Sequence, residues 1–373
     1  MRDFALEAYF SQWEFTAKHH MTASDAQSMS IQELLNLAGE GAQEELEQCW
    51  LGYTPTWGDE ELRDLIAQNY ERIQSSQVLC FAGAEEGLYV AMRTLLQPGD
   101  HMVVFTPNYQ AAESVPEDIG VSITGVDLRP ENDWCPQPQE LKAAITPNTR
   151  LVSVNFPNNP TGSIPSQELW MDIIEICRHH NLYLFSDEVY RGLELHPHHR
   201  LPQAADVYEK ALSLNVLSKS YGFPGLRLGW IACQESKLLG EMERYKHYLS
   251  ICNPSPTETL GKMVLRHGSK IWEKNRQLIA SNLDILDDFF AHYPHLFEWK
   301  RPQGGCVAFP RYLGAEGAQT FCQKLVQEQG VLLLPPSVYD TSYGPSHPQH
   351  FRIGFGRKNI QEGLEAMKGG LSV

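Results

Sequence analysis

The chain has 373 residues, which is more than a single typical hydrophobic core accommodates, so the length predicts two closely packed domains. Its content of 42 % hydrophobic and 10 % aromatic residues is ordinary for a globular enzyme. The net charge of −16 argues against nucleic acid or an anionic membrane as a partner.

No apolar run has the length of a membrane-spanning helix, and the first residues lack the basic, apolar and small-residue order of a secretory signal. The eight cysteines contain no C-x-x-C pair, which argues against a zinc site or a disulfide framework. We therefore expect a cytoplasmic protein with reduced thiols and no bound metal.

Apolar runs alternate with helix-like segments through residues 78–233. The first run, 78–82, predicts a buried strand, and the amphipathic helix after it ends near Gln97, before a Pro-Gly-Asp turn. Six similar runs follow, at 101–106, 122–127, 151–156, 182–186, 211–217 and 228–233. Seven buried strands with crossover helices predict an α/β fold with a largely parallel, doubly wound sheet covered on both faces.

The remaining sequence predicts a smaller α+β domain. Residues 254–295 indicate a long helical region that leaves the sheet, and 305–309 and 331–334 indicate strands. The first forty residues are expected to return to this smaller domain. We therefore expect three parts: an N-terminal segment (1–45) that packs on the small domain, a large domain (46–255) and a small C-terminal domain (256–373).

Polar residues follow several of these strands, and open α/β sheets bind ligands beyond the carboxyl ends of their strands. After the first strand, Gly83, Ala84 and Glu85 open a helix whose free N–H groups suit a phosphate. After the next strand comes Tyr109, an aromatic ring that either stacks on a planar ligand or packs in the core.

The next strand ends also carry polar groups. Asn159 lies in a turn-rich loop, where its amide can donate to an oxygen on a planar ring. Asp187 ends an apolar strand, where an unpaired carboxylate costs several kcal/mol in order of magnitude, so it needs a cationic partner such as a protonated ring nitrogen. Tyr190, three residues later, can give a second hydrogen bond to the ring oxygen.

The segment from 217 to 230 identifies the ligand more closely. Lys219 offers an amine that forms a Schiff base with an aldehyde when it is partly desolvated and close to other cations. Arg227, eight residues later, can form a fork with a phosphate. Pyridoxal 5′-phosphate is the common cofactor that carries both an aldehyde and a phosphate, so these residues predict it.

Together these motifs resemble the class I/II aminotransferase family of fold-type-I pyridoxal-phosphate enzymes, over nearly the whole chain. They occur in the family's order: N-P-T-G at 159–162, D-x-x-Y at 187–190, S-K-x-x-x-x-P-G-x-R-x-G at 218–229, and F-R-I-G at 351–354. The resemblance implies the fold-type-I architecture, a large domain with a mostly parallel seven-stranded sheet plus a smaller α+β domain.

The resemblance also assigns roles. Lys219 matches the lysine of the internal aldimine, which also carries the proton, and Asp187 matches the partner of the ring nitrogen. Three residues match contacts of the cofactor ring: Asn159 and Tyr190 as donors to its oxygen, and Tyr109 as the stacking aromatic. The residues that match the phosphate site are Gly83, Ala84, Glu85, Ser218 and Arg227. The residue that matches the site of the substrate α-carboxylate is Arg352, with Asn159 beside it.

Tyr53 matches the tyrosine that the family lends to the phosphate of the neighbouring subunit, which implies a homodimer. Two positions depart from the family pattern. Val216 stands where the family commonly has a serine that binds the phosphate, and losing such a bond costs roughly 1.5–3 kcal/mol. Glu85 stands where serine or threonine is commoner, so its side chain is expected to point away from the phosphate.

The resemblance implies an aminotransferase that moves an amino group between an α-amino acid and a 2-oxo acid by ping-pong transamination. The same chemistry can expel a β-substituent, and the segments 222–225 and 304–311 also resemble capreomycidine synthase, a branch that eliminates and cyclises. The segment 187–190 favours the transaminase. A pyridoxal-dependent transcription regulator would need a basic DNA-binding module, and only about fifty residues precede Tyr53.

An aromatic group near the N-terminus has two interpretations. Tyr9, Phe10, Trp13 and Phe15 either close over substrate as a lid or anchor the segment to the small domain, and we favour anchoring. Glu14, which lies among them, is a hypothetical partner for a cationic substrate side chain.

Overall fold

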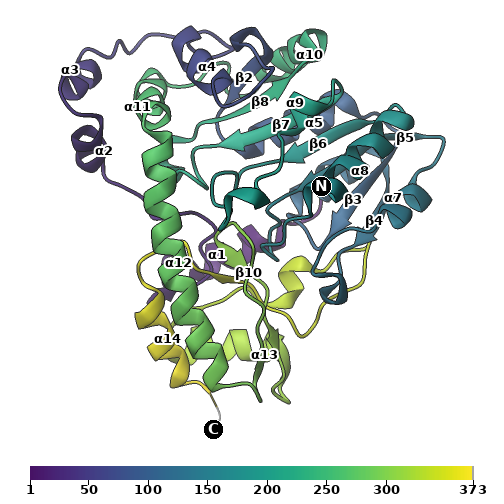
Figure 1. The fold of residues 1–373 in the computed structure, drawn as a ribbon, viewed down its shortest axis with the longest axis vertical. Coiled ribbons are helices and arrows are strands. Elements are labelled where there is room, and N and C mark those ends of the chain that lie inside the picture. Colours follow the sequence, from purple (N-terminus) through teal and green to yellow (C-terminus); the bar gives the residue numbers. More distant parts are fainter. Residues whose placement is uncertain (372–373) are drawn as a thin grey trace.

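A seven-stranded sheet forms the centre of residues 1–371, the part of the chain that the computed structural model describes (Figure 1). Its strands are β2 (Val78–Phe81), β3 (His101–Thr106), β4 (Ser122–Asp127), β5 (Thr149–Asn155), β6 (Tyr183–Asp187), β7 (Ala211–Val216) and β8 (Gly229–Cys233). They pair in the order β2-β8-β7-β6-β5-β3-β4, and only β8 runs antiparallel to its neighbours. The predicted seven-stranded, mostly parallel sheet is confirmed.

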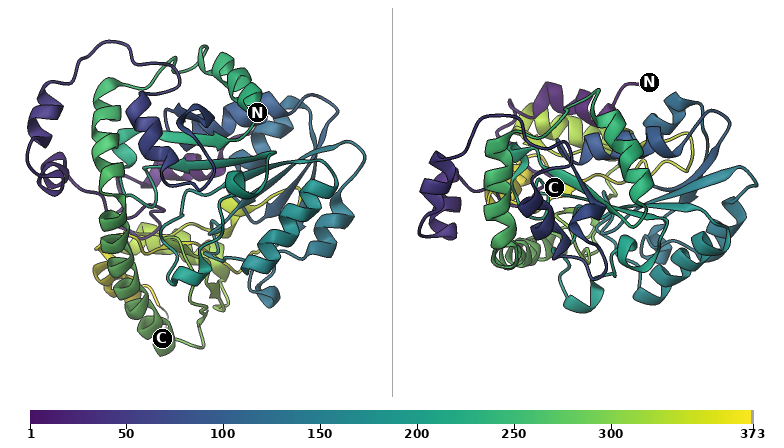
Figure 2. Two further views of the ribbon diagram at one scale, coloured as in Figure 1. Left: turned by 45° about the horizontal axis from the view of Figure 1, so that its top comes forward. Right: turned by 90° about the horizontal axis from the view of Figure 1, so that it is seen from above.

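Helices cover both faces of this sheet (Figure 2). Successive side chains of a strand point to opposite faces, so in β3 Met102 and Val104 join one apolar cluster while Val103 and Phe105 join another. The first cluster contains side chains of α5 (Ala84–Leu95), α6 (Ala111–Ile119) and α10 (Ser236–Lys246). The second contains side chains of α7 (Pro138–Ala144), α8 (Gln167–His179) and α9 (Ala204–Val207). Burial on both faces explains why the strands are nearly continuous apolar runs.

Two helices lead away from the sheet, where the sequence predicted a helical region. They are α11 (Ser255–Arg266) and α12 (Gly268–His292), and α12 continues into the C-terminal part (Figure 1). Three helices pack against α11: α2 (Ile31–Ala38), α3 (Ala42–Glu47) and α4 (Glu60–Ala67).

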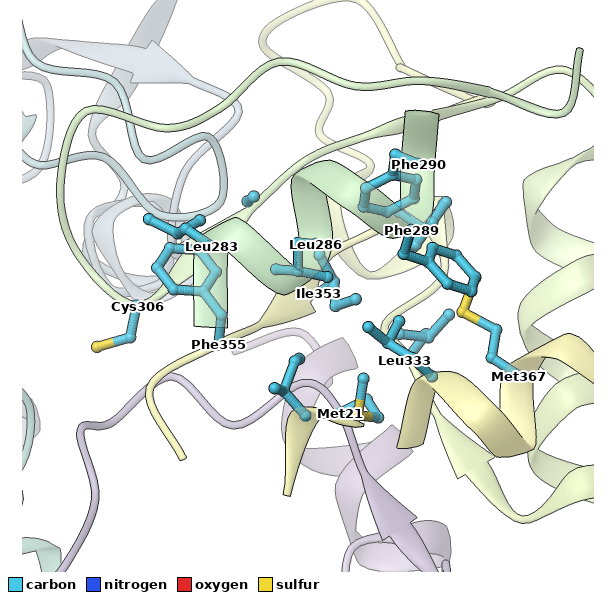
Figure 3. Close-up of a cluster of buried hydrophobic side chains, with 14 of the residues drawn as sticks. Met21, Leu283, Leu286, Phe289, Phe290, Cys306, Leu333, Ile353, Phe355 and Met367 are labelled. Atoms are coloured by element: carbon cyan, nitrogen blue, oxygen red, sulfur yellow. The ribbon is translucent and has the colours of Figure 1, made fainter. Parts of the chain in front are cut away.

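The C-terminal part consists of short strand pairs and two helices around an apolar cluster (Figure 3). Its elements are β9 (Phe297–Glu298), β10 (Val307–Ala308), β11 (Arg311–Tyr312), α13 (Gly317–Lys324), β12 (Val331–Leu332), β13 (Ile353–Gly354) and α14 (Ile360–Lys368). Leu283, Leu286 and Phe290 of α12 pack there with Ile353 and Met367. β10 and β12 are shorter than the predicted strands 305–309 and 331–334: Gly305 has φ +77°, outside the extended region, and Leu334 forms only an isolated bridge with Arg352.

The N-terminal segment contributes to this C-terminal part. Strand β1 (His19–His20) pairs in parallel with β12, and helix α1 (Ala5–Trp13) contacts residues 336–339. The division of the chain at residues 45 and 255 remains a prediction. Within residues 1–371, no helix combines the length and the apolarity that crossing a bilayer requires.

Candidate active site

A cavity lies at the carboxyl ends of the sheet strands. It encloses about 1280 Å³ of space that no atom fills, part of it open to solvent. Its wall is formed by α1, the segment that follows β1, the ends of β2, β3, β5, β6 and β7, and the loop around Arg352 and Arg357. The wall therefore unites residues from the whole length of the chain.

Lys219 enters the cavity from the loop after β7. Its Nζ donates a hydrogen bond of 2.8 Å to Ser24 Oγ, and its carbonyl accepts from the Ala26 N–H at 3.0 Å. Burial lowers the pKa of Lys219; the Asp25 carboxylate opposes this effect and the Arg352 guanidinium adds to it. The amine is thus shifted toward the neutral form that attacks a carbonyl carbon.

Asp187 is the last residue of β6 and points into the same cavity. Its Oδ1 accepts from the Val189 N–H at 3.2 Å, and its own carbonyl accepts from Asn155 Nδ2 at 3.0 Å. Burial raises the pKa of Asp187 to about 7. Asp187 forms no ion pair with any residue from 1 to 371, so its carboxylate is suited to a cationic group of a ligand.

Two donors lie on the wall near Asp187. The Tyr190 side chain is 1 % exposed, lines the cavity, and its hydroxyl finds no hydrogen-bond partner among the described residues. Asn159 Oδ1 accepts from Arg352 Nη1 and from the Tyr339 hydroxyl, both at 3.1 Å. Since arginine can only donate, the amide nitrogen of Asn159 stays free to donate elsewhere. Both groups therefore offer hydrogen bonds to a ligand.

Tyr109 follows β3 and completes this part of the wall. Its ring packs against Phe4, with 5.2 Å between centroids and 60° between planes. The structure therefore places Tyr109 both at the cavity and in an aromatic contact with the N-terminal segment.

Arg352 is fully buried at one end of the cavity. Its Nε and Nη2 donate to the hydroxyl and the carbonyl of Thr22, at 3.2 and 2.8 Å, and its Nη1 donates to Asn159 and to the Tyr339 hydroxyl. All these acceptors are neutral. Because a buried cation is costly without a negative partner, this geometry suits the carboxylate of a ligand.

A second cationic region lies at the start of α5. Arg227 Nη1 donates to Ser218 Oγ at 3.3 Å, and the guanidinium lies over Gly83, where a Cβ would come within 2.7 Å of Nη2. The same Gly83 has φ +97° and no side chain to cap α5, so the first N–H groups of the helix are available to an anion. Ala84 lines the cavity here as well.

Glu85 also lines this region. Burial raises its pKa, and the Tyr109 hydroxyl is the neighbouring group that opposes this effect most strongly. The carboxyl group thus faces Tyr109. That no phosphate contacts it stays a prediction.

Of the residues that the sequence predicted for the site, Tyr53 alone lies away from the cavity wall and its immediate support. Its side chain is 85 % exposed. Trp50 and Leu51, close by in the sequence, are also exposed.

Sequence reasoning missed several wall residues. Ser24 binds Lys219, and Asp25 forms a two-bond ion pair with Arg357, at 3.2 and 3.0 Å. His20 and Glu7 also face the cavity. None of these four residues belongs to a recognisable sequence motif. Arg357, the partner of Asp25, lies five residues after Arg352, and this spacing is the one feature of the sequence that could have pointed to the pair.

The chain is similar to several known proteins over most of its length. The model of the family "Aminotransferase class I and II" matches residues 21–367. Capreomycidine synthase of Streptomyces vinaceus is 29 % identical over 366 residues, covering 97 % of this chain and 92 % of its own length. Arginine–pyruvate transaminase of Pseudomonas aeruginosa is 30 % identical over 310 residues, covering 81 % and 77 %. The crystal structure of a PLP-dependent aminotransferase from Streptococcus suis has a TM-score of 0.93 at 28 % identity, covering 99 % of this chain and 97 % of the other.

The residues of the cavity fit pyridoxal phosphate. The unpartnered Tyr190 hydroxyl suits the ring oxygen, and Asp187, which lacks a cation, suits the ring nitrogen. The Arg227 guanidinium, packed where Gly83 leaves room for it, suits the phosphate. Lys219, with its lowered pKa, suits the aldehyde.

Proposed function

The chain belongs to the aminotransferase class I and II family, whose cofactor is pyridoxal 5′-phosphate, and from this premise we propose that it transfers an amino group between an α-amino acid and a 2-oxo acid. The observation that carries this proposal is the pairing of Lys219 and Arg352 in one cavity. Arg352 offers a buried fork with neutral partners to a carboxylate, and Lys219 offers a buried amine with a lowered pKa. An α-amino acid has a carboxylate and an acidic Cα–H within reach of these two groups.

In this mechanism Arg352 binds the substrate carboxylate and so fixes the direction of the Cα–H bond. The bound cofactor supplies an electrophilic carbon and a conjugated ring that accepts the electrons of that bond. Lys219 Nζ takes the proton from Cα as general base and would later deliver it, as general acid, to the electrophilic carbon that the cofactor supplies. Burial lowers the pKa of Lys219 and so shifts the amine toward the neutral form that can accept this proton.

The other wall residues act on the charge and position of the ring. The Asp187 carboxylate would hold a proton on the ring nitrogen by charge pairing, which would lower its own pKa again. Tyr190 and Asn159 would donate hydrogen bonds to the ring oxygen. Ser218, Arg227 and the first N–H groups of α5 would bind the phosphate.

We further propose a homodimer. Two loops that contact each other through a 2.6 Å hydrogen bond from Thr54 Oγ1 to the Asn253 carbonyl carry exposed apolar side chains. These side chains are Trp50, Leu51, Tyr53, Tyr248, Leu249 and Ile251. Such a patch is unusual on a monomer and suits a second copy of the chain. Tyr53 within it would reach the phosphate of the neighbouring subunit, and sedimentation velocity tests the oligomeric state.

A second reaction has support from the comparisons. Capreomycidine synthase matches 97 % of this chain, so elimination with cyclisation is the alternative that we keep. Both reactions begin with removal of the Cα proton by Lys219. Transamination then needs the proton delivered to the carbon that the cofactor supplies, whereas elimination expels a substituent from the β-carbon of the substrate.

For location we propose the reducing cytoplasm, because all eight cysteines are free.

Absorbance spectroscopy distinguishes the two reactions. The purified enzyme with its cofactor is mixed with a panel of amino acids, without any 2-oxo acid. Loss of the yellow band that a 2-oxo acid then restores supports transamination. Release of ammonia or a cyclic product with an unchanged band supports elimination, and a panel that leaves both the spectrum and the amino acids unchanged refutes the proposal.

A further inference from the structure

One face of α1 gives the cavity a negatively charged wall. Glu7, Phe10 and Glu14 occur at helical spacing and all line the cavity, while Leu6 packs into the core beside them. Glu14 is partly buried, with 34 % of its side chain exposed. Burial raises the pKa of Glu14, and the charge of Glu7 raises it further. The two carboxylates therefore repel each other across the same space.

The charges of Arg357 and Lys219 partly offset that of Glu14, but among the described residues neither forms an ion pair with Glu7 or Glu14. His20 lies 3.8 Å from Glu14, but burial lowers the pKa of His20 to about 4, so the ring is uncharged at pH 7. Arg357 also lines the cavity, but it already forms a two-bond ion pair with Asp25. Glu7, Glu14, Asp25 and Arg357, the charged groups on this side of the cavity, together carry a net charge of −2.

The ligand site itself does not depend on these carboxylates. The fully buried Arg352 and the unpartnered, 1 % exposed hydroxyl residue Tyr190 open into the same cavity and require a ligand there. In the proposed reaction Arg352 binds the α-carboxylate and Lys219 takes the proton from Cα. These two residues therefore contact the groups that all α-amino acids share. The side chain of the substrate must then meet the rest of the wall, which includes α1.

Resting on the function proposed above, we propose that Glu7 and Glu14 select amino acids whose side chains end in a positive charge, a guanidinium or an ammonium group. An aliphatic chain of three or four carbons passes the Phe10 ring, and the cation at its end relieves the repulsion between the carboxylates. A neutral side chain leaves that repulsion in place, and an acidic side chain adds to it. Arg357 does not reverse this preference, because Asp25 occupies its fork.

Substrate pairs of equal shape test the selection. L-arginine is compared with the neutral L-citrulline, and L-lysine with the neutral L-2-aminoheptanoate, in wild type, Glu7→Gln, Glu14→Gln and the double variant. An ion pair between the substrate and one partly buried carboxylate changes the binding affinity roughly five- to tenfold. With two carboxylates, we expect wild type to prefer the cationic substrate at least about tenfold in kcat/KM. The preference should fall toward one in the double variant, while kcat/KM for citrulline changes less than about twofold.

A binding measurement separates this inference from the proposed reaction. 5-Guanidinopentanoate lacks the amino group and cannot react, so its affinity for the enzyme with bound cofactor is measured by calorimetry against pentanoate. The control Glu131→Gln removes the same charge from an exposed position away from the cavity and should keep the preference.

The outcomes are distinct. Equal affinity for 5-guanidinopentanoate and pentanoate in wild type, or a preference that survives in the double variant, overturns the selection by Glu7 and Glu14. A panel of amino acids that gives no reaction refutes the proposed function, although calorimetry still reports the preference for a cation. A preference for arginine over lysine identifies the guanidinium as the recognised group, and the reverse identifies the ammonium.

Discussion

Replacing Asp187 by asparagine should stabilise the cofactor-free protein at alkaline pH. Burial raises the pKa of Asp187 from an ordinary value of 3.8 to about 7. A tenfold change in proton affinity corresponds to about 1.4 kcal/mol, so the charged side chain above pH 7 costs the folded chain about 4 kcal/mol. Water in the cavity reaches part of Asp187, which reduces this cost to about 2–4 kcal/mol.

The sign follows from proton linkage. The folded chain binds this proton more tightly than the unfolded chain does, so stability from Asp187 is complete below pH 4 and is lost as the pH rises to about 7. Asparagine resembles the protonated acid and has no such loss. The variant should therefore match wild type near pH 4 and exceed its free energy of unfolding by about 2–4 kcal/mol at pH 8.

Urea unfolding of the cofactor-free proteins, followed by tryptophan fluorescence between pH 5 and pH 8, measures the difference. Asp172→Asn on the exposed side of α8 is the matched control and should show no pH-dependent gain. Added pyridoxal phosphate should reverse the order, since only a carboxylate pairs with the ring nitrogen. A gap between Asp187→Asn and wild type that stays constant from pH 5 to pH 8 would refute the reasoning.

Three further variants test the proposed binding of substrate and cofactor. Arg352→Lys keeps the charge but loses the fork, so kcat/KM for α-amino acids should fall roughly 10- to 100-fold while the cofactor affinity from spectral titration stays unchanged; loss of both together would contradict a role in substrate binding. Val216→Ser restores a hydroxyl beside the proposed phosphate site and should tighten cofactor binding about tenfold or more by equilibrium dialysis, and unchanged affinity would show that this position does not reach the phosphate. Tyr53→Phe should weaken cofactor binding roughly tenfold or more, and mixed dimers with Lys219→Ala should recover one tight site, which they would not do if Tyr53 served its own subunit.

The fold could be predicted because burial and sequence pattern agree in the sheet. All residues of β2, β3 and β7 are buried, so β2 is an uninterrupted apolar run and the other two strands are mostly apolar. The boundary of β5 was missed by two residues, because Thr149 and Arg150 are polar and Arg150 points to solvent. Strand β1 was not predicted at all, since two histidines have no periodicity and their pairing with β12 is tertiary.

The site, like the fold, contains residues that the sequence predicted and residues that it did not. The residues within motifs were predictable, because turn geometry and strand ends fix them locally. The partners of those residues were not, since 195 positions separate Ser24 from Lys219 and 332 separate Asp25 from Arg357. Glu14 was suspected from its charge alone, but the face that it shares with Glu7 follows from how α1 packs. The aromatic residues near Glu14 lie in different environments: Phe10 lines the cavity, Tyr9 packs against the core and Phe15 is exposed to solvent.

The charges of the cavity indicate that the folded chain is completed by its ligands. Lys219, Arg227 and Arg352 form no ion pair within residues 1–371, and Asp187 has no cation. Such groups are costly in a protein interior unless something bound there pairs with them. A phosphate, a protonated ring nitrogen and a substrate carboxylate supply the three missing partners, while the aldehyde removes the charge of the lysine altogether. The residues whose charges destabilise the folded chain on its own are therefore the ones that we propose bind cofactor and substrate, so each ligand should stabilise the folded protein through them.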